Sequence, residues 1–191
     1  MRRREAILEA ATAILIDEGY ARLSTRTIAA RAGMRPGNLQ YYYRAKVDVV
    51  RAMLGRYLDA AARAVETRIA ADGATPQARL HSAIDGILAD QESPQSCRFF
   101  RELWALAAHD RTVEAAMRDF YTGYWRRVVA LLLEANPGHG RPRAERRAAL
   151  LIAMIEGLML FRSPRPPYSL PIPALERELH ALAERVVLDA P

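Results

Sequence analysis

Hydrophobic residues recur at intervals of three or four along most of the chain, which is the spacing of one face of an α-helix. Proline and glycine divide this pattern into helical lengths, and no stretch shows the strict alternation that a strand would have between turn signals. The longest apolar run, at 148–161, is shorter than the roughly 20 residues of a membrane span and contains Glu156. The sequence therefore predicts an all-α protein of about nine helices, with no membrane as a partner.

The first three predicted helices are closely spaced. An apolar stripe predicts a helix at about 4–18, which Gly19 can close in a left-handed conformation. Ser24 is a good N-cap for a short second helix that ends at Gly33. Pro36 suits the first turn of a third helix. Two short helices joined by a glycine-containing turn are typical of a helix-turn-helix.

Longer helices are predicted in the rest of the chain, and two of them begin where a hydroxyl side chain precedes a proline. They are expected at about 46–71, from 75–76, from 93–94, from 110 to about 135, at 143–162 and at 173–188. We therefore expect two domains, a helix-turn-helix domain over 1–46 and a larger helical domain over 47–191.

Positive charge is concentrated at the start of the chain. Residues 1–46 carry nine basic and four acidic side chains, a net charge of +5, whereas the whole chain carries +6. An arginine-rich composition would spread the charge evenly, so its concentration favours an anionic partner for the first quarter of the chain. A single cysteine, Cys97, cannot form an intrachain disulfide, and the arginines at the start precede no recognisable signal peptide. We expect a cytoplasmic protein.

The stretch "RAGMRPGNLQYYYRAK", residues 31–46, contains three consecutive tyrosines. Three adjacent tyrosines on a helix cannot all point into one core, because each buried hydroxyl needs a partner. Leu39 and Tyr43 are four residues apart and would share the inner face, which leaves Gln40 and Tyr41 outward. Asparagine and glutamine can pair with adenine edges in a DNA groove, and a tyrosine ring can touch a thymine methyl.

Residues 4–54 resemble the DNA-binding domain of TetR-type transcriptional regulators. The resemblance rests on "ILEAA" at 7–11, "GY" at 19–20, "STRTIAARAG" at 24–33 and "PGNLQYYYRAK" at 36–46, in this order and spacing. The sequence departs from the family at Gln40, where many members carry tyrosine, and at Tyr41, often histidine or tryptophan. Base preference is therefore not implied by the resemblance.

The resemblance also implies roles for individual residues. Thr25 and Lys46 would hold phosphates on either side of a groove, and Arg26 would approach a base edge or a phosphate. The residues predicted to contact a double-stranded DNA operator are Thr25, Arg26, Arg35, Pro36, Gly37, Asn38, Gln40, Tyr41, Tyr42 and Lys46.

For the larger domain, the resemblance implies ligand binding and dimerisation. One helix-turn-helix reads only a short half-site, so a homodimer is expected, with an intersubunit four-helix bundle built from the last two helices. The predicted interface residues are Leu151, Ile155, Leu158, Leu175, Leu179, Leu182 and Val186, although both stripes could also face the protomer's own core. A small-molecule effector of unknown identity is expected to contact Phe99, Leu103, Trp104, Phe120, Tyr121, Tyr124 and Trp125, unless these residues form core.

These features predict a sequence-specific transcriptional regulator, a repressor by family expectation, with no cofactor and no catalytic site. One alternative is a nonspecific nucleic-acid-binding or scaffold protein on the same fold. Another is a helical enzyme, because Glu176, His180 and Glu184 lie on one helix face and could in principle hold a metal. Such a triplet is more often a solvated charged face, and the sequence contains no phosphate loop, nucleophile elbow or dinucleotide fingerprint.

Overall fold

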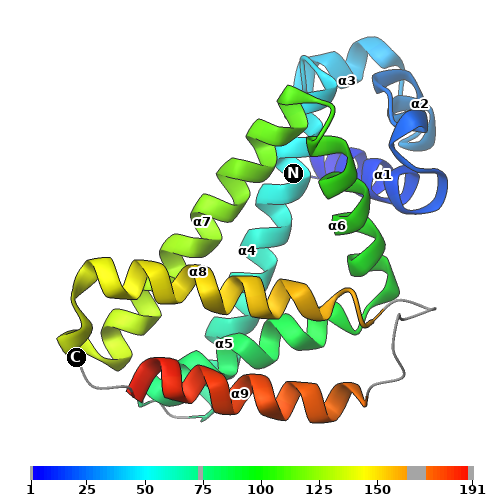
Figure 1. Cartoon of the computed structure of the whole chain (residues 1–191). Coiled ribbons are helices and arrows are strands. Elements are labelled where there is room, and N and C mark those ends of the chain that lie inside the picture. The colour runs from blue at the N-terminus through cyan, green and yellow to red at the C-terminus, as the bar shows by residue number, and fades with distance from the viewer. Residues whose placement is uncertain (1, 73–74, 163–170, 189–191) are drawn as a thin grey trace. The chain divides into compact units, whose positions relative to one another are not determined.

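The computed structural model describes residues 2–72, 75–162 and 171–188. Within these ranges the chain forms nine α-helices and two short 3-10 turns, and it contains no strand. Figure 1 shows the helices in order from α1 to α9. The prediction of an all-α fold is confirmed. No helix of the described residues is long and apolar enough to cross a membrane.

The helices begin and end close to the predicted positions. Their bounds are α1 (Arg2–Glu18), α2 (Thr25–Arg31), α3 (Pro36–Tyr42), α4 (Lys46–Asp72), α5 (Pro76–Gln91), α6 (Pro94–Ala107), α7 (Arg111–Ala135), α8 (Gly140–Leu158) and α9 (Ile172–Leu188). The agreement follows from local capping. For example, the hydroxyl of Thr75 accepts a hydrogen bond from the backbone N–H of Ala78 at 3.2 Å, and a proline follows it.

The chain divides into two compact units, Met1–Asp59 with Arg98–Tyr121, and Ala60–Cys97 with Thr122–Pro191. The helices α4, α6 and α7 each contribute residues to both units. This division differs from the predicted boundary between residues 46 and 47. The difference arises because apolar side chains of α4, such as Val49 and Val50, are fully buried in the first unit.

The first unit contains the helix-turn-helix. Ile7, Ile14 and Leu15 of α1 are buried, as are Ile28 of α2 and Leu39 of α3. Contacts join α1 to α2 and α2 to α3. Burying a branched aliphatic side chain stabilises a fold by about 1.5–3 kcal/mol, so this small apolar cluster fixes the three helices relative to one another.

Two local devices fix the turns of this motif. The Ser24 hydroxyl accepts a hydrogen bond from the backbone N–H of Thr27, and the Thr27 hydroxyl accepts one from the backbone N–H of Ser24. After α2, Gly33 adopts a positive φ of 65°, which turns the chain toward Pro36 at the start of α3.

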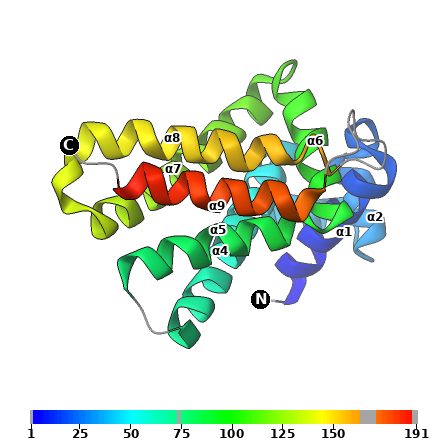
Figure 2. The same ribbon diagram turned by 60° about the horizontal axis from the view of Figure 1, so that its bottom comes forward.

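The second unit is built around α5, α8 and α9, which contact one another pairwise. Figure 2 shows α8 and α9 side by side, with α5 next to α9. The buried aliphatic residues of these helices include Ile84 and Leu88 of α5, Leu151 and Ile155 of α8, and Leu179 of α9. The apolar run at 148–161, which is too short for a membrane span, lies largely in α8.

Candidate nucleic-acid interface

Helix α3 has one buried residue and an exposed outer face. Leu39 is completely buried and anchors the helix on α2. Asn38, Gln40 and Tyr41 are exposed, and no hydrogen bond joins their side chains to any other described residue. A short helix held by one apolar anchor therefore presents two amides and a phenol to the outside.

The three consecutive tyrosines have three different environments. Tyr41 is 86% exposed, and its ring meets the partly buried ring of Tyr42 edge-on with the centroids 5.3 Å apart. Tyr43 ends the helix and is half-buried rather than fully in the core as predicted. Burial raises the pKa of Tyr43, while the positive charge of Arg4 opposes that rise. The apolar anchor is thus Leu39 alone.

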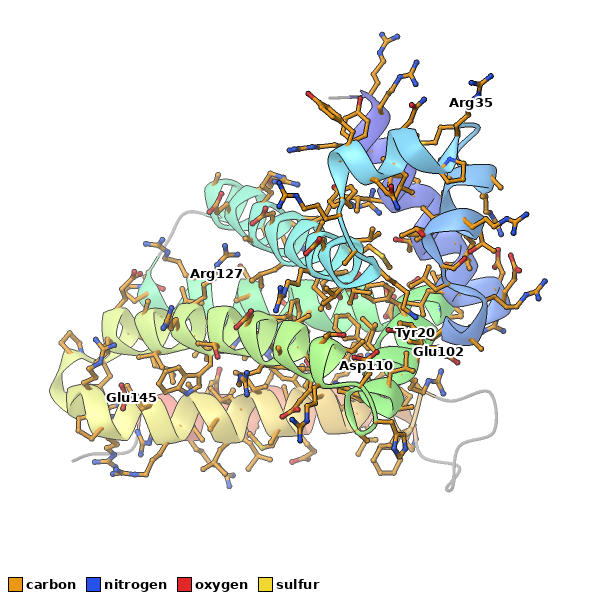
Figure 3. All side chains as sticks on the ribbon, turned by 90° about the horizontal axis from the view of Figure 1, so that it is seen from above. Tyr20, Arg35, Glu102, Asp110, Arg127 and Glu145 are labelled. Carbon is orange, nitrogen blue, oxygen red and sulfur yellow. The ribbon has the colours of Figure 1, made fainter. Side chains whose placement is uncertain are left out.

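The start of α3 leaves space for an approaching surface. Arg35, Pro36 and Gly37 are exposed, and the side chain of Arg35 points away from the fold (Figure 3). A Cβ added at Gly37 would meet no atom within 4 Å, and Gly37 does not have a positive φ. The fold itself therefore does not require glycine at this position, whereas close approach of an external molecule would.

The start of α2 lies beside this region in the helix-turn-helix. Arg26 is exposed and Thr25 is half-buried, and neither side chain bonds to another described residue. Since Ser24 and Thr27 satisfy each other in the capping box, the hydroxyl of Thr25 is not needed to cap the helix.

Most carboxylates of this region are bound by internal ion pairs. Glu5 pairs with Arg56 at 3.0 Å, and Asp17 and Glu18 both pair with Arg31, at 3.0 and 2.9 Å. Several exposed arginines have no acidic partner in the part of the chain that the structure describes, namely Arg2, Arg3, Arg4, Arg26, Arg35 and Arg44. The positive charge of the region is therefore left available to an outside anion.

Two family models match this chain. The model of bacterial regulatory proteins of the tetR family covers residues 7–53, and the model of the BetI-type transcriptional repressor C-terminal domain covers residues 76–186. The chain belongs to the TetR family. It is a DNA-binding transcriptional regulator of repressor type, and regulators of this family are not enzymes.

Curated relatives and solved structures agree with this assignment. An HTH-type regulator from the dhlA 5' region of Xanthobacter autotrophicus is 31% identical over 62% of this chain and 60% of its own length, so the match spans less than two thirds of that relative. The regulator BetI of Rhizobium meliloti is 28% identical over 84% of this chain and 78% of its own.

Two solved regulators share the fold. One from Pseudomonas aeruginosa PAO1 superimposes with a TM-score of 0.80 at 21% identity, over 97% of this chain and 90% of its own. One from Saccharomonospora viridis, determined in complex with choline, gives a TM-score of 0.70 at 18% identity, over 96% of both chains.

Lys46, predicted from the TetR family to hold a phosphate, has a protein partner in this structure. Its ammonium nitrogen lies 3.5 Å from the centroid of the Tyr20 ring. The hydroxyl of Tyr20 donates a hydrogen bond to Asp110 at 2.9 Å, and its backbone N–H points to Glu102 at 3.5 Å. Figure 3 shows Tyr20, Glu102 and Asp110 gathered at one place in the first unit. No sequence signal linked these residues, because Tyr20 and Asp110 are 90 positions apart.

The aromatic residues predicted to line a ligand site divide between the two units. In the first unit, the Phe100 ring packs against Phe99 at 5.3 Å and Phe120 at 5.4 Å between centroids, and Leu103 is fully buried. The indole N–H of Trp104 donates to the hydroxyl of Tyr121 at 2.8 Å. Tyr57 of α4, which was not predicted, meets the Phe100 ring at 4.7 Å. These rings form a packed aromatic cluster, and their role in binding a ligand stays a prediction.

Tyr124 and Trp125 belong to the second unit. Tyr124 is buried, and burial strongly raises the pKa of its hydroxyl. The indole N–H of Trp125 donates to the backbone carbonyl of Glu145 at 3.0 Å, which ties α7 to α8.

The predicted dimer residues include four that the protomer buries itself. Leu151, Ile155, Leu158 and Leu179 lie in the core of the second unit, so the core alternative holds for these four and they offer a second chain almost no surface. Leu175 and Val186 are half-buried, and Leu182 is 42% exposed. Two further leucines of the same region, Leu150 and Leu160, are 60% and 64% exposed and were not predicted.

The three residues weighed as metal ligands each bind a different partner. Glu176 accepts a hydrogen bond from Arg162, His180 lies 2.8 Å from a carboxylate oxygen of Asp85, and Glu184 lies 3.3 Å from His81. Among the described residues, no group of histidine, cysteine and acidic side chains is arranged to hold a metal. These side chains instead join α9 to α5 and to the residues that follow α8.

Proposed function

We propose that the outer face of α3 reads the bases of a near-palindromic operator in the major groove. The observation that carries this proposal is the exposure of Gln40 and Tyr41, without hydrogen-bond partners among the described residues, on a helix fixed by the buried Leu39. Gln40 and Asn38 are suited to adenine edges, and the Tyr41 ring to a thymine methyl.

Backbone contacts would place this helix in the groove. Thr25, Arg26 and Arg35 carry free hydroxyl or guanidinium groups suited to phosphate oxygens. Pro36 and Gly37 would permit close approach, and Tyr42 would support Tyr41 through its edge-on ring. Lys46 would also bind a phosphate, but only after its ammonium group leaves the face of the Tyr20 ring.

A homodimer in the cytoplasm is the proposed working form. Two reading helices placed about 34 Å apart on one face of DNA would double the length of sequence that is read. Among the described residues, the exposed leucines Leu150, Leu160 and Leu182 on and beside α8 and α9 offer apolar surface to a second copy.

A small molecule would release the repressor from its operator. The first class to test is a quaternary ammonium compound such as choline, because the chain carries a BetI-type C-terminal domain and a structural neighbour was determined with choline. Aromatic rings can bind such a cation through their faces. Because α4 contributes to both units, a ligand that displaced α4 would also move the reading helix that precedes it.

The test is selection from random duplex DNA by the purified protein at near-physiological salt. Enrichment of a near-palindrome, and a changed preference at one half-site position for Gln40→Ala, are the expected results. Binding without enrichment, which disappears as salt rises, would support the nonspecific alternative instead. The selected duplex then serves to test whether choline lowers the affinity.

A further inference from the structure

Lys46 is the only lysine of the chain and the first residue of α4. A positive side chain at a helix N-terminus is disfavoured by the helix dipole, so its charge does not stabilise α4. Among the described residues, no carboxylate lies within ion-pair distance of its ammonium group. The contact that the structure gives this group is the face of the Tyr20 ring, 3.5 Å from the nitrogen to the centroid.

The backbone at the start of α4 is fixed without the Lys46 side chain. The carboxylate of Asp48 accepts a hydrogen bond from the backbone N–H of Ala45 at 2.9 Å, and Val49 and Val50 are fully buried. A lysine carries its ammonium group on a long and flexible stem. The ammonium group can therefore leave the ring by rotation of the side chain alone, while α4 stays in place.

Tyr20, by contrast, is held from several sides. Its backbone N–H points to Glu102 of α6 at 3.5 Å, and its hydroxyl donates a hydrogen bond to Asp110 at 2.9 Å (Figure 3). Its carbonyl accepts a hydrogen bond at 2.9 Å from the backbone N–H of Leu23, which is buried. The ring is therefore the fixed member of the pair, and the side chain of Lys46 is the member that can move.

Asp110 keeps the ring in place because it is itself fixed. Its Oδ1 accepts hydrogen bonds from the backbone N–H groups of Thr112 at 2.8 Å and Val113 at 3.3 Å, at the start of α7. Its Oδ2 accepts the hydrogen bond from the hydroxyl of Tyr20. The start of α7 therefore holds the ring that covers Lys46.

We propose that the Tyr20 ring competes with the DNA backbone for the ammonium group of Lys46, and so lowers the affinity of the protein for any duplex. A charge-assisted bond to a phosphate is stronger than a contact with a ring face, so the phosphate displaces the ring. The apparent affinity nevertheless falls in proportion to the fraction of free protein in which Lys46 is off the ring. The usual strength of such a contact corresponds to about two- to fivefold in that fraction. The inference rests on the proposed phosphate contact of Lys46 and adds an internal competitor to it.

The first test measures affinity for a mixed-sequence duplex, at near-physiological salt, in a double-mutant cycle. Tyr20→Leu should bind about two- to fivefold more tightly than the wild-type protein for each reading head. Lys46→Ala should bind more weakly, with a slope of log affinity against log salt that is shallower by about 0.9 for each head. In the Lys46→Ala background, Tyr20→Leu should leave the affinity unchanged. Thermal unfolding checks that all variants are folded.

The second test observes the contact itself by NMR. Because Lys46 is the only lysine, isotope-labelled lysine gives a single ε-methylene signal. In the free wild-type protein the ring current of Tyr20 should shift this signal upfield. The matched control Tyr20→Phe, which keeps the ring, should retain the upfield shift, and Tyr20→Leu should lose it. Addition of duplex DNA should move the wild-type signal out of the ring current as well.

Three results would overturn the proposal. An upfield shift that persists in the DNA complex would mean that the ring holds Lys46 on the phosphate rather than away from it. Weaker DNA binding by Tyr20→Leu, or tighter binding that does not require Lys46, would exclude competition. An unchanged salt slope in Lys46→Ala would show that Lys46 binds no phosphate. Because all these measurements use a duplex of any sequence, failure to select an operator is a separate result that concerns the reading face of α3.

Discussion

The ammonium nitrogen of Lys46 lies 3.5 Å from the centroid of the Tyr20 ring. Tyr20 follows α1 and Lys46 begins α4, so this contact joins the segment that precedes α2 to the segment that follows α3. Burial and the neighbouring Asp110 raise the pKa of the Tyr20 hydroxyl, which keeps it a donor to that carboxylate. Burial also lowers the pKa of Lys46, with Asp110 opposing this effect.

Tyr20→Phe removes the hydroxyl that donates to Asp110 and keeps the ring under Lys46. We expect the free energy of unfolding to fall by about 1 kcal/mol, because Asp110 is partly exposed and water can replace part of the bond. Urea unfolding measures this. The matched control is Tyr41→Phe, whose hydroxyl has no partner in the described structure and whose loss should leave stability unchanged. Equal effects in the two variants would contradict the role of the Tyr20–Asp110 bond.

The stacking of Lys46 on Tyr20 can be isolated with a double-mutant cycle. Lys46→Ala and Tyr20→Leu, made singly and together, should show a coupling of about 0.5–1 kcal/mol in the free energy of unfolding. The same cycle with Arg44→Ala, at an exposed residue without a partner among the described residues, should show no coupling. A coupling of similar size in both cycles would mean that the ammonium does not act on the ring.

Asp110 should make stability depend on pH in the acid range. Hydrogen bonds from Thr112, together with those from Tyr20 and Val113, lower its pKa to about 2. A carboxyl whose pKa is lower in the folded state stabilises the fold above its unfolded pKa of about 3.9. That contribution is lost as the pH falls from about 4 to about 2.

The variant Asp110→Asn should therefore remove part of the pH dependence of stability between about pH 4 and 2, as measured by urea unfolding across that range. Asparagine can still cap α7, so the helix should remain formed. Asp119→Asn serves as control, because Asp119 is an exposed carboxylate of α7 without a hydrogen-bond partner among the described residues. Identical curves for the wild-type protein and Asp110→Asn would refute the prediction.

The helix starts could be predicted from sequence because their causes are local. Ser24, Thr75 and Asp110 each accept a hydrogen bond from a backbone N–H three residues later, at 3.1, 3.2 and 3.3 Å. A residue type at a fixed short spacing is sufficient to specify such a cap. The outward position of Gln40 and Tyr41 followed in the same way from the spacing of Leu39 within a short helix.

The partners of side chains could not be predicted, because they come from distant positions. No sequence pattern joins Tyr20 to Asp110, or Glu5 to Arg56 51 residues later. The predicted dimer residues divide between core and surface for a related reason. Leu150 and Leu151 are adjacent and chemically identical, yet they are 60% and 1% exposed. Helix α8 is apolar on two faces, and only the face that packs against α5 and α9 is buried.

Gly37→Ala should separate folding from DNA binding. The fold has room for the added methyl group, and alanine favours a helix over glycine by up to about 1 kcal/mol, so thermal stability should be kept or rise. Operator affinity should fall, because the methyl group occupies the space needed for close approach to DNA. In Gly33→Ala, by contrast, the positive φ of 65° should lower stability by about 1 kcal/mol. Undiminished operator binding by a folded Gly37→Ala protein would remove Gly37 from the interface.

Leu182→Glu should weaken the proposed homodimer. Leu182 is 42% exposed on α9, so a carboxylate is tolerated in the protomer but is costly in an apolar interface between two copies. Sedimentation over a range of concentrations should show a dimer for the wild-type protein and a shift toward monomer for the variant, with no loss of helix content. Ala89→Glu places the same charge on an exposed position of α5 and should stay dimeric. If Leu182→Glu remained as dimeric as Ala89→Glu, the interface would have to lie away from this face of α9. The variant Leu150→Glu on α8 would then decide whether α8 alone supplies the interface.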